Sequence, residues 1–210
     1  MFETRQPVGV ILGGGRGLRI GGSKLTVALR GRPLMAYPLA AMREVVADVA
    51  VIAKADVVLP WLPGAMLWIE PDAPRNPLLG VVEALALAGG RSALVCPADL
   101  PFVTPALLAA LAEAPDDGSP AVVASCHGTS RPLLGCYRYQ AAAMLADAAH
   151  VAADAGHDEE FVRGAVAAIG PREFEVADEL ELFDVDTPDD LLQASAMLDA
   201  QGYSPPGTTR

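Results

Sequence analysis

The sequence predicts an α/β protein with a mainly parallel central sheet that is covered by helices on both faces. Short apolar runs alternate with helix-forming segments along most of the 210 residues. The runs are continuously apolar, as is typical of strands buried on both faces. Helix starts are marked by cap residues followed by proline, for example at Thr104-Pro105. Strands and helices that alternate in this way are typical of parallel sheets.

The first part of the chain contains three apolar runs and two helical segments. Val8–Leu12 predicts a buried strand, and a helix is expected from Pro33 to about Val46. A second strand is expected at Val49–Ala53 and a weaker third strand at Met66–Ile69. Pro77–Ala88 predicts a helix whose first residue is proline.

The second part of the chain continues the alternation. Strands are expected at Ala93–Cys96, Ala121–Cys126 and Leu133–Tyr137, with an antiparallel direction open for the last. Further helices are expected from Thr104-Pro105, at Gln140–Ala153, at Glu159–Ile169 and from Thr187 to about Asp199. No repeat or clear linker divides the chain, so we expect one domain over residues 1–200 and a disordered tail at 201–210.

The overall charge limits the classes of partner. The net charge is −11, from 15 Lys and Arg against 26 Asp and Glu, which argues against nucleic-acid and anionic-membrane surfaces. No apolar run approaches the ~20 residues of a membrane span, and the polar N-terminus is unlike a secretory peptide. The widely spaced Cys96, Cys126 and Cys136 predict reduced thiols in the cytoplasm. The three histidines match no metal-binding spacing.

A glycine-rich segment follows the first predicted strand. Residues 12–24 read Leu-Gly-Gly-Gly-Arg-Gly-Leu-Arg-Ile-Gly-Gly-Ser-Lys and include the cations Arg16, Arg19 and Lys24. Glycine lets the backbone approach a ligand closely, so several N–H groups can point at phosphate oxygens. A basic, glycine-rich segment in an acidic chain therefore predicts a polyphosphate ligand.

Two common phosphate-binding motifs do not fit this segment. A P-loop requires lysine directly after the last glycine, but Ser23 separates Gly22 from Lys24. A dinucleotide fingerprint requires G-x-G-x-x-G, and its third glycine would fall on Leu18 or Ile20. Lys54 also stands at the end of the second strand, where an NAD site has an acidic residue. A nicotinamide-dependent oxidoreductase is therefore the weaker hypothesis.

Acidic residues are expected near the same edge of the sheet. Asp99 comes shortly after the strand at Ala93–Cys96, and Asp184 and Asp186 are also expected to follow a strand. Ligands in such sheets bind beyond the carboxyl ends of the strands, so these residues can meet the glycine-rich segment there. Asp184 is interpreted as a loop carboxylate, and Asp186 as either functional or part of a helix start.

Five segments, taken in order along the chain, carry a resemblance to one family. They are residues 12–24, 76–80 (Asn-Pro-Leu-Leu-Gly), 98–102 (Ala-Asp-Leu-Pro-Phe), 131–137 (Arg-Pro-Leu-Leu-Gly-Cys-Tyr) and 184–191 (Asp-Val-Asp-Thr-Pro-Asp-Asp-Leu). They resemble L-A-G-G-x-x-x-R-M-G-x-D-K, G-P-L-x-G, C-D-x-P-F, R-x-P-L and N-x-N-T-P-E-D-L of the molybdenum cofactor guanylyltransferase-like (MobA-like) NTP transferases. The resemblance covers nearly the whole chain and implies a three-layer α/β/α Rossmann-like nucleotidyltransferase fold.

The resemblance also implies a reaction and a set of site residues. A phosphate of an acceptor, molybdopterin in the first instance, would attack the α-phosphorus of GTP and release pyrophosphate, and fixed cations would stabilise the developing charge. The implied catalytic residues are Arg19, Lys24 and Asp99, and the implied Mg²⁺ ligands are Asp99 and Asp186. The implied nucleotide-binding residues are Leu12, Gly13, Gly14, Gly15, Arg19, Lys24, Asp72, Pro77, Leu78 and Gly80.

The identity of the nucleotide and of the acceptor is less constrained. Asp72 matches the family aspartate that can accept from N1–H and N2–H of guanine, which favours GTP, although CTP stays an option. Ser23, Asn76 and the Asp184-x-Asp186 pair depart from the family motifs. They leave phospholactate or a sugar or isoprenoid phosphate open as acceptors. An inactive nucleotide-binding accessory protein is a further alternative, and the oligomeric state is open.

Overall fold

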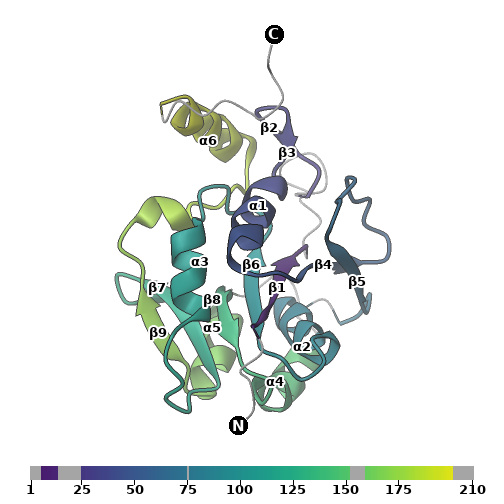
Figure 1. Cartoon of the computed structure of the whole chain (residues 1–210), viewed down its shortest axis with the longest axis vertical. Coiled ribbons are helices and arrows are strands. Elements are labelled where there is room, and N and C mark those ends of the chain that lie inside the picture. The colour runs from purple at the N-terminus through teal and green to yellow at the C-terminus, as the bar shows by residue number, and fades with distance from the viewer. Residues whose placement is uncertain (1–5, 14–24, 75, 152–158, 201–210) are drawn as a thin grey trace.

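A seven-stranded sheet forms the centre of the computed structural model, which describes residues 6–13, 25–74, 76–151 and 159–200 (Figure 1). The strands lie in the order β5-β4-β1-β6-β8-β7-β9. Their bounds are β1 Val8–Leu12, β4 Val49–Lys54, β5 Met66–Glu70, β6 Ala93–Pro97, β7 Ala121–Cys126, β8 Thr129–Tyr137 and β9 Arg172–Glu175. Within this sheet β8 alone is antiparallel to its neighbours, and every other adjacent pair is parallel. The predicted mainly parallel, mixed sheet is confirmed.

The register of the central strands aligns their carboxyl ends at one edge of the sheet. Leu12 at the end of β1 lies opposite Ile52 of β4 and Pro97 of β6. The carboxyl ends of these three strands therefore lie side by side. All five residues of β1 are buried, as its continuous apolar sequence predicts.

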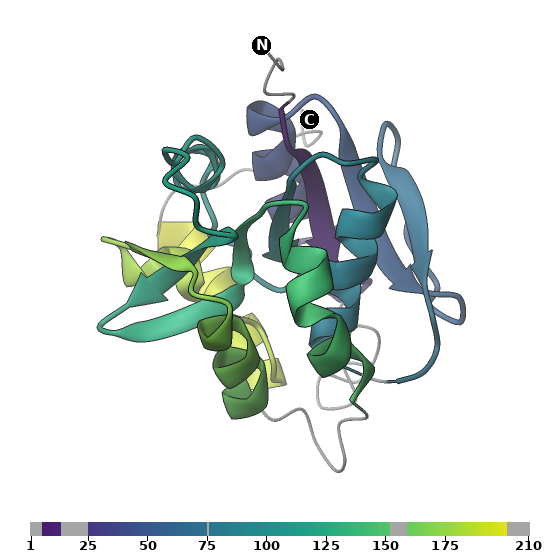
Figure 2. The same cartoon turned by 90° about the horizontal axis from the view of Figure 1, so that it is seen from below.

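Helices cover both faces of the sheet (Figure 2). Met42 of α1 and Leu108 of α3 belong to one core cluster, whereas Leu85 of α2 and Leu145 of α4 belong to a second cluster on the opposite face. The bounds are α1 Ala36–Val45, α2 Pro77–Leu87, α3 Pro105–Ala112, α4 Ala141–His150 and α5 Glu159–Ala168. The second cluster also includes Val162 of α5. The three-layer α/β/α prediction is confirmed.

A smaller assembly stands above the carboxyl ends of the strands in Figure 1. It consists of α6 (Pro188–Ala200) and a short hairpin of β2 (Ala28–Leu29) and β3 (Arg32–Pro33). Leu29, Ala194 and Leu198 share a third apolar cluster. Arg30 of the hairpin turn pairs with Asp199 of α6 at 2.6 Å.

Some expected elements differ from those observed. The helix expected from Pro33 begins only at Ala36, because Arg32–Pro33 pairs as β3. Neither the β2–β3 hairpin nor the edge strand β9 was expected, since both are short and β9 is largely exposed and charged. The tail at 201–210 lies outside the described residues, and no helix in the described part is long and apolar enough to cross a membrane.

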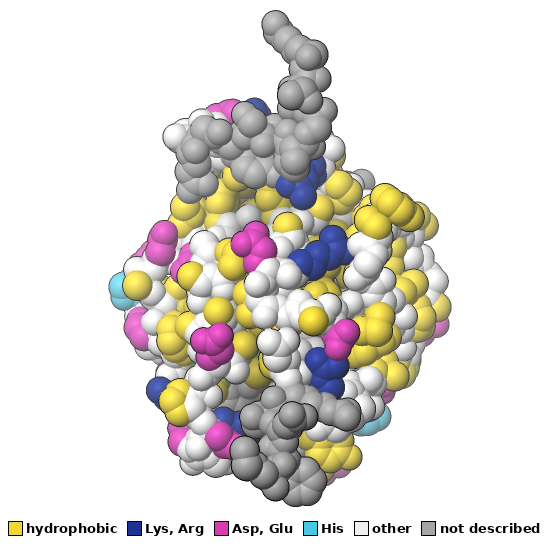
Figure 3. Space-filling model, in the orientation of Figure 1, with side chains coloured by type: hydrophobic (Ala, Val, Ile, Leu, Met, Phe, Trp, Pro, Cys, Tyr) yellow, Lys and Arg dark blue, Asp and Glu magenta, His cyan; other side chains and the backbone are white. Residues whose placement is uncertain are grey.

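Exposed apolar side chains are concentrated along one edge of the sheet. Met66, Leu67 and Ile69 of the edge strand β5 are 43, 54 and 50% exposed, and Trp61 in the preceding loop is 87% exposed. Hydrophobic side chains gather on the right of the face drawn in Figure 3. The weaker strand expected at Met66–Ile69 is present as β5, and its burial pattern is mostly exposed although its sequence is apolar.

Candidate functional site

The described residues on either side of positions 14–24, Gly13 and Leu25, lie at the carboxyl edge of the sheet. The N–H of Gly13 donates to the carbonyl of Ile52 at 2.8 Å, and the N–H of Ala98 donates to that of Leu12 at 3.2 Å. A Cβ placed on Gly13 would lie 3.0 Å from Cδ1 of Leu25, which is itself 1% exposed. Both flanks of the segment therefore lie together, close to the end of β6.

Several predicted site residues fall within this segment. Gly14, Gly15, Arg19 and Lys24 lie outside the described residues, so their nucleotide-binding and catalytic roles stay predictions. Leu12 is buried, and its side chain packs into the core on the α2 side. A role for Leu12 in nucleotide binding would therefore involve its backbone.

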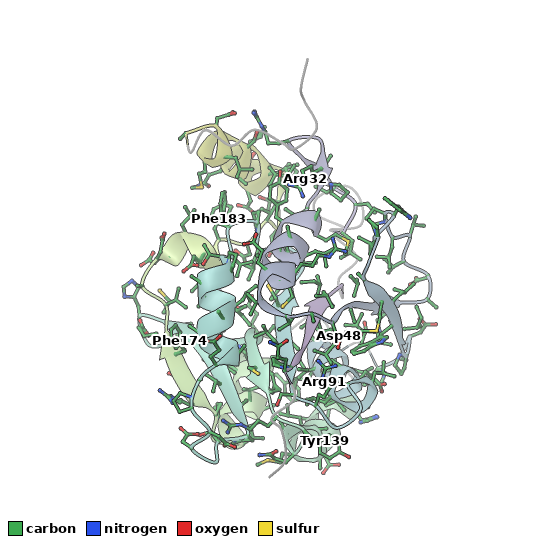
Figure 4. All side chains as sticks on the ribbon, viewed as in Figure 1. Arg32, Asp48, Arg91, Tyr139, Phe174 and Phe183 are labelled. Atoms are coloured by element: carbon green, nitrogen blue, oxygen red, sulfur yellow. The ribbon has the colours of Figure 1, made fainter. Side chains whose placement is uncertain are left out.

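The acidic segment 184–186 is held directly beside Asp99. The N–H of Val185 donates to the carbonyl of Asp99 at 3.0 Å. The rings of Phe102 and Phe183 meet edge to face, with centroids 5.9 Å apart. Phe183 is labelled in Figure 4. These contacts join two parts of the chain that are far apart in sequence.

The route by which the chain reaches this segment differs from the expected one. Asp184 and Asp186 were expected to follow a strand, but a 3₁₀-helix, η2 (Glu179–Leu182), lies between β9 and this segment. The expectation that these residues meet Asp99 is confirmed, although through the backbone contact of Val185 and not through strand register.

The carboxylates of this segment influence one another electrostatically. Partial burial raises the pKa of the Asp184 carboxyl above its usual range, and the negative charges of Asp186 and Asp99 raise it further. Arg131 partly offsets this effect. A hard cation such as Mg²⁺ is bound by one or two carboxylates together with phosphate oxygens and waters, so this donor set fits Mg²⁺.

The backbone at Asp186 is fixed by the start of α6. The carboxylate of Asp190 accepts from the N–H of Asp186 at 3.1 Å and from the N–H of Thr187 at 2.8 Å. The N–H of Asp190 donates in return to the Thr187 hydroxyl at 3.2 Å, as in a capping box. The helix start therefore positions Asp186, whose predicted role as a metal ligand stays a prediction.

Lys54 and Glu70 form a largely buried ion pair at the same edge, at the ends of β4 and β5. Nζ of Lys54 lies 3.3 Å from Oε1 of Glu70 and donates to the carbonyl of Pro71 at 2.6 Å. Glu70 is 6% exposed; burial raises its pKa, and the Lys54 charge opposes that rise. Lys54 is one of only two lysines in the chain, and the sequence predicted no partner for it.

Gly80 packs against this pair. A Cβ at Gly80 would lie 3.3 Å from Oε2 of Glu70 and 3.5 Å from the Leu12 side chain. Asp72 is exposed and lies one residue beyond Pro71, whose carbonyl Lys54 holds. The structure therefore brings Asp72 and Gly80 close to Lys54 and Glu70, while their predicted contacts with a nucleotide stay predictions.

Asn76 has a clear local role at the start of α2. Its Oδ1 accepts from the N–H of Leu78 at 3.0 Å, and its Nδ2 donates to the carbonyl of Ala148 at 2.6 Å and to that of Val151 at 3.2 Å. This side chain therefore caps α2 and ties it to the end of α4. The nucleotide-binding roles of Pro77 and Leu78 stay predictions, and the Leu78 N–H is already bonded to the cap.

Arg131 is a second cation near this edge of the sheet, and no role was predicted for it from the sequence. Because β8 is antiparallel to β7, its first residues lie at the carboxyl edge, and Arg131 pairs with Ala124 in that ladder. Its charge acts on Asp184. The antiparallel direction of β8 thus brings a positive side chain towards the acidic segment.

Comparisons with known proteins show the family of this chain. A family model described as the MobA-like NTP transferase domain matches residues 9–168. A protein of Chloroflexus aggregans named "Probable molybdenum cofactor guanylyltransferase" is 34% identical over 202 residues, covering 90% of this chain and 94% of that one. The molybdenum cofactor guanylyltransferase of Cereibacter sphaeroides is 34% identical over 195 residues, covering 90% and 96%.

Solved structures show the same fold. Molybdopterin-guanine dinucleotide biosynthesis protein A from Archaeoglobus fulgidus has a TM-score of 0.73 at 22% identity, covering 92% of this chain and 99% of that one. The 2-C-methyl-D-erythritol 4-phosphate cytidylyltransferase of Thermus thermophilus has a TM-score of 0.59 at 23% identity, covering 92% and 98%. The fold is the Rossmann-like α/β fold of nucleotidyltransferases. This chain belongs to the MobA-like NTP transferase family.

Proposed function

We propose that this protein is a Mg²⁺-dependent molybdenum cofactor guanylyltransferase. It transfers GMP from GTP to a phosphate of molybdopterin and releases pyrophosphate. The observation that carries the proposal is the meeting of three parts at one sheet edge: the flanks of the glycine-rich segment, Asp99, and the segment 184–186. The names of the relatives from Chloroflexus aggregans and Cereibacter sphaeroides support the choice of reaction. The free thiols Cys96 and Cys136 support a reducing, cytoplasmic location.

The proposed mechanism depends on positioning and charge neutralisation. A phosphate monoester is already nucleophilic at neutral pH, so its oxygen attacks the α-phosphorus in line and no covalent protein nucleophile is required. Lys24, Arg19 and the N–H groups of the glycine-rich segment stabilise the charge that develops as pyrophosphate leaves. Asp99 and Asp186 would hold Mg²⁺, which neutralises charge on the phosphate oxygens.

The proposed base-binding site lies at the ends of β4 and β5. The exposed Asp72 carboxylate would accept hydrogen bonds from N1–H and N2–H of guanine, whereas cytosine offers only its amino group. The neighbouring Lys54 holds the Pro71 carbonyl and so fixes the chain directly before Asp72. This arrangement supports GTP over CTP.

An assay of pyrophosphate release tests the proposal. The purified chain with Mg²⁺ is given GTP or CTP, each with molybdopterin, phospholactate, or a sugar or isoprenoid phosphate. We expect release with GTP and molybdopterin. Release with CTP and molybdopterin alone would overturn the nucleotide assignment, release with another acceptor alone would overturn the acceptor assignment, and no release with any pair would overturn the activity.

Replacing Asp99 tests the metal assignment. Asp99→Asn removes a negative charge from the proposed Mg²⁺ site, and we expect turnover to fall on the order of 100-fold, with more Mg²⁺ needed for half-maximal rate. Asp147→Asn, which changes an exposed aspartate of α4, is the matched control and should leave both values unchanged. An Mg²⁺ titration of Asp99→Asn that matches the unaltered protein would remove Asp99 from the site.

Replacing Lys24 tests the assignment of the glycine-rich segment. Lys24→Ala should reduce turnover strongly while the free energy of unfolding stays nearly constant, since we assign this side chain to phosphate and not to the core. Rates of pyrophosphate release and urea denaturation measure the two effects. Equal losses of turnover and stability would contradict the assignment.

A further inference from the structure

A thiol, an imidazole and a carboxylate come together at the turn between β7 and β8. Cys126 is the last residue of β7, His127 begins the turn, and Glu179 is the first residue of η2. One ligand atom from each side chain lies within 4.8 Å of the other two. Within the described residues this is the one group of three His, Cys, Asp or Glu side chains that meets this spacing.

The backbone holds His127 in a fixed place. His127 and Gly128 have φ values of 50° and 73°, as the two central residues of a tight hairpin turn, and Cys126 pairs with Thr129 across it. The N–H of His127 donates to Oε1 of Glu175 at 2.8 Å. A non-glycine residue with positive φ is uncommon, and Asn is a frequent choice at such a position.

The side chains then converge from two parts of the chain. Nε2 of His127 contacts Oε1 of Glu179, although the two residues are 52 positions apart in sequence. Oε1 and Oε2 of the neighbouring Glu175 accept from the His127 N–H and from the Ser125 hydroxyl, the latter at 2.9 Å. Glu175 therefore supports the turn, and Glu179 supplies the carboxylate that meets the imidazole.

The chemistry of the three groups fits a borderline transition metal. Cys sulfur, His nitrogen and Glu oxygen are the ligands that Zn²⁺ takes in proteins, commonly in a tetrahedral arrangement. Mg²⁺ prefers oxygen ligands alone, which distinguishes this group from the carboxylates around Asp99.

We propose that Cys126, His127 and Glu179 bind Zn²⁺ or a similar divalent transition metal ion, with water as the fourth ligand. The ion ties the β7–β8 turn to η2. Since η2 ends two residues before Asp184, the ion also restrains the approach of the chain to the acidic segment 184–186. The site is separate from the proposed Mg²⁺ site and does not depend on the proposed function.

Metal binding is tested on the full chain after chelator treatment, with Mg²⁺ in excess throughout to fill oxygen-only sites. Titration with Co²⁺ should give a thiolate-to-cobalt charge-transfer band that saturates at one equivalent, and Zn²⁺ should abolish it by displacement. Zn²⁺ should also slow alkylation of Cys126, read by mass spectrometry. Cys96 and Cys136 are buried and serve as internal references.

Three variants and one control decide the ligands. Cys126→Ser should remove the cobalt band, and His127→Asn and Glu179→Gln should weaken Zn²⁺ binding by more than the roughly 10- to 100-fold that loss of an outer hydrogen-bond partner costs. Asn suits the positive φ at residue 127, so this variant keeps the turn. His150→Gln, at an exposed histidine of α4, should bind Zn²⁺ like the unaltered protein.

Two results would overturn the proposal. One is the absence of a thiolate band with Co²⁺ in the unaltered protein. The other is an equal loss of Zn²⁺ affinity in His127→Asn and His150→Gln. Neither result bears on guanylyl transfer, which is measured separately as pyrophosphate release with Mg²⁺.

Discussion

At the scale of single residues, the Lys54–Glu70 pair shows how a charge is tolerated beside the core. The Glu70 carboxylate is 6% exposed and the Lys54 side chain is 15% exposed, so both have lost most of their contact with water. The ammonium group satisfies the carboxylate and also the Pro71 carbonyl. Removing one partner would leave the other charged and buried, which is costly.

We predict that Lys54→Met lowers the free energy of unfolding on the order of 3 kcal/mol at neutral pH. Burial already raises the Glu70 pKa above its ordinary value of 4.5, so the folded state takes up a proton more readily than the unfolded chain. Stability therefore falls as pH rises through the window between the unfolded and the folded pKa. Without Lys54 the pKa of Glu70 in the folded state rises further, so this pH window widens. The loss of stability caused by Lys54→Met should therefore shrink as pH falls towards 4.5. Urea denaturation over a pH series measures this.

The exposed pair Arg163–Glu159 is the control for this prediction. Arg163→Met breaks an ion pair of 3.1 Å on the surface of α5 and should change stability by less than about 1 kcal/mol at any pH. In a Glu70→Gln background, Lys54→Met should also lower the free energy of unfolding by a smaller amount. A loss of stability in Lys54→Met that does not change with pH would contradict the explanation.

At the scale of elements, β8 joins the four parallel strands β5, β4, β1 and β6 to the parallel pair of β7 and β9. It is antiparallel to both β6 and β7, and its pairing with β7 shifts register between Val123 and Ala124. Gly135 lies directly beside this irregularity. A Cβ on Gly135 would lie only 2.5 Å from the carbonyl oxygen of Val122, so a side chain would force the two strands apart.

We predict that Gly135→Ala lowers the free energy of unfolding by about 1–3 kcal/mol, as expected for overpacking against backbone. Gly164→Ala is the matched control, because a Cβ at Gly164 of α5 would meet nothing within 4 Å. That substitution should raise stability by about 0.5–1 kcal/mol, since alanine favours a helix over glycine. Chemical denaturation of the two variants compares them, and equal effects of the same sign would refute the packing argument.

At the scale of the whole molecule, the candidate site lies where separate parts of the fold meet. The sheet supplies Gly13, Lys54 and Glu70 at its carboxyl edge, and the loop after β6 supplies Asp99. The assembly of α6 with the β2–β3 hairpin holds the segment 184–186 through Val185, which is buried in the third apolar cluster. A ligand that bridges these parts would link their stabilities.

We predict that GTP with Mg²⁺ raises the melting temperature of the whole chain, whereas NAD and NADP do not. Free ligand at 100 times its Kd stabilises a protein by about 2.7 kcal/mol if it binds the folded state alone. A thermal shift series over GTP, CTP, NAD and NADP measures this effect. A shift with nicotinamide cofactors alone would exclude the proposed nucleotide site.

Much of the fold was predictable because local patterns agree with the tertiary structure. The apolar runs at Val8–Leu12 and Ala121–Cys126 are strands with the expected ends. The Thr104 cap was also found, with its hydroxyl accepting from the N–H of Leu107. The strand β9 could not be predicted, since only its pairing with β7 and not its sequence makes it a strand.

The candidate site was predictable in part. Motif order indicated Asp99 and the segment 184–186, and the contact of Val185 with Asp99 confirms that they meet. The Lys54–Glu70 pair was missed, because the two charged residues are 16 positions apart and pair only through the parallel register of β4 and β5. No sequence motif links Lys54 to Glu70, because only the alignment of β4 with β5 brings them together.

By itself the sequence determined the class of fold, the order of most of its strands and helices along the chain, and the family of its motifs. These properties depend on local patterns of apolar, cap and glycine residues, which each segment carries alone. The tertiary structure alone decided which charges meet: Lys54 with Glu70, and His127 with Glu179. The physical reason is that strand register and loop packing bring together side chains that the chain itself keeps far apart.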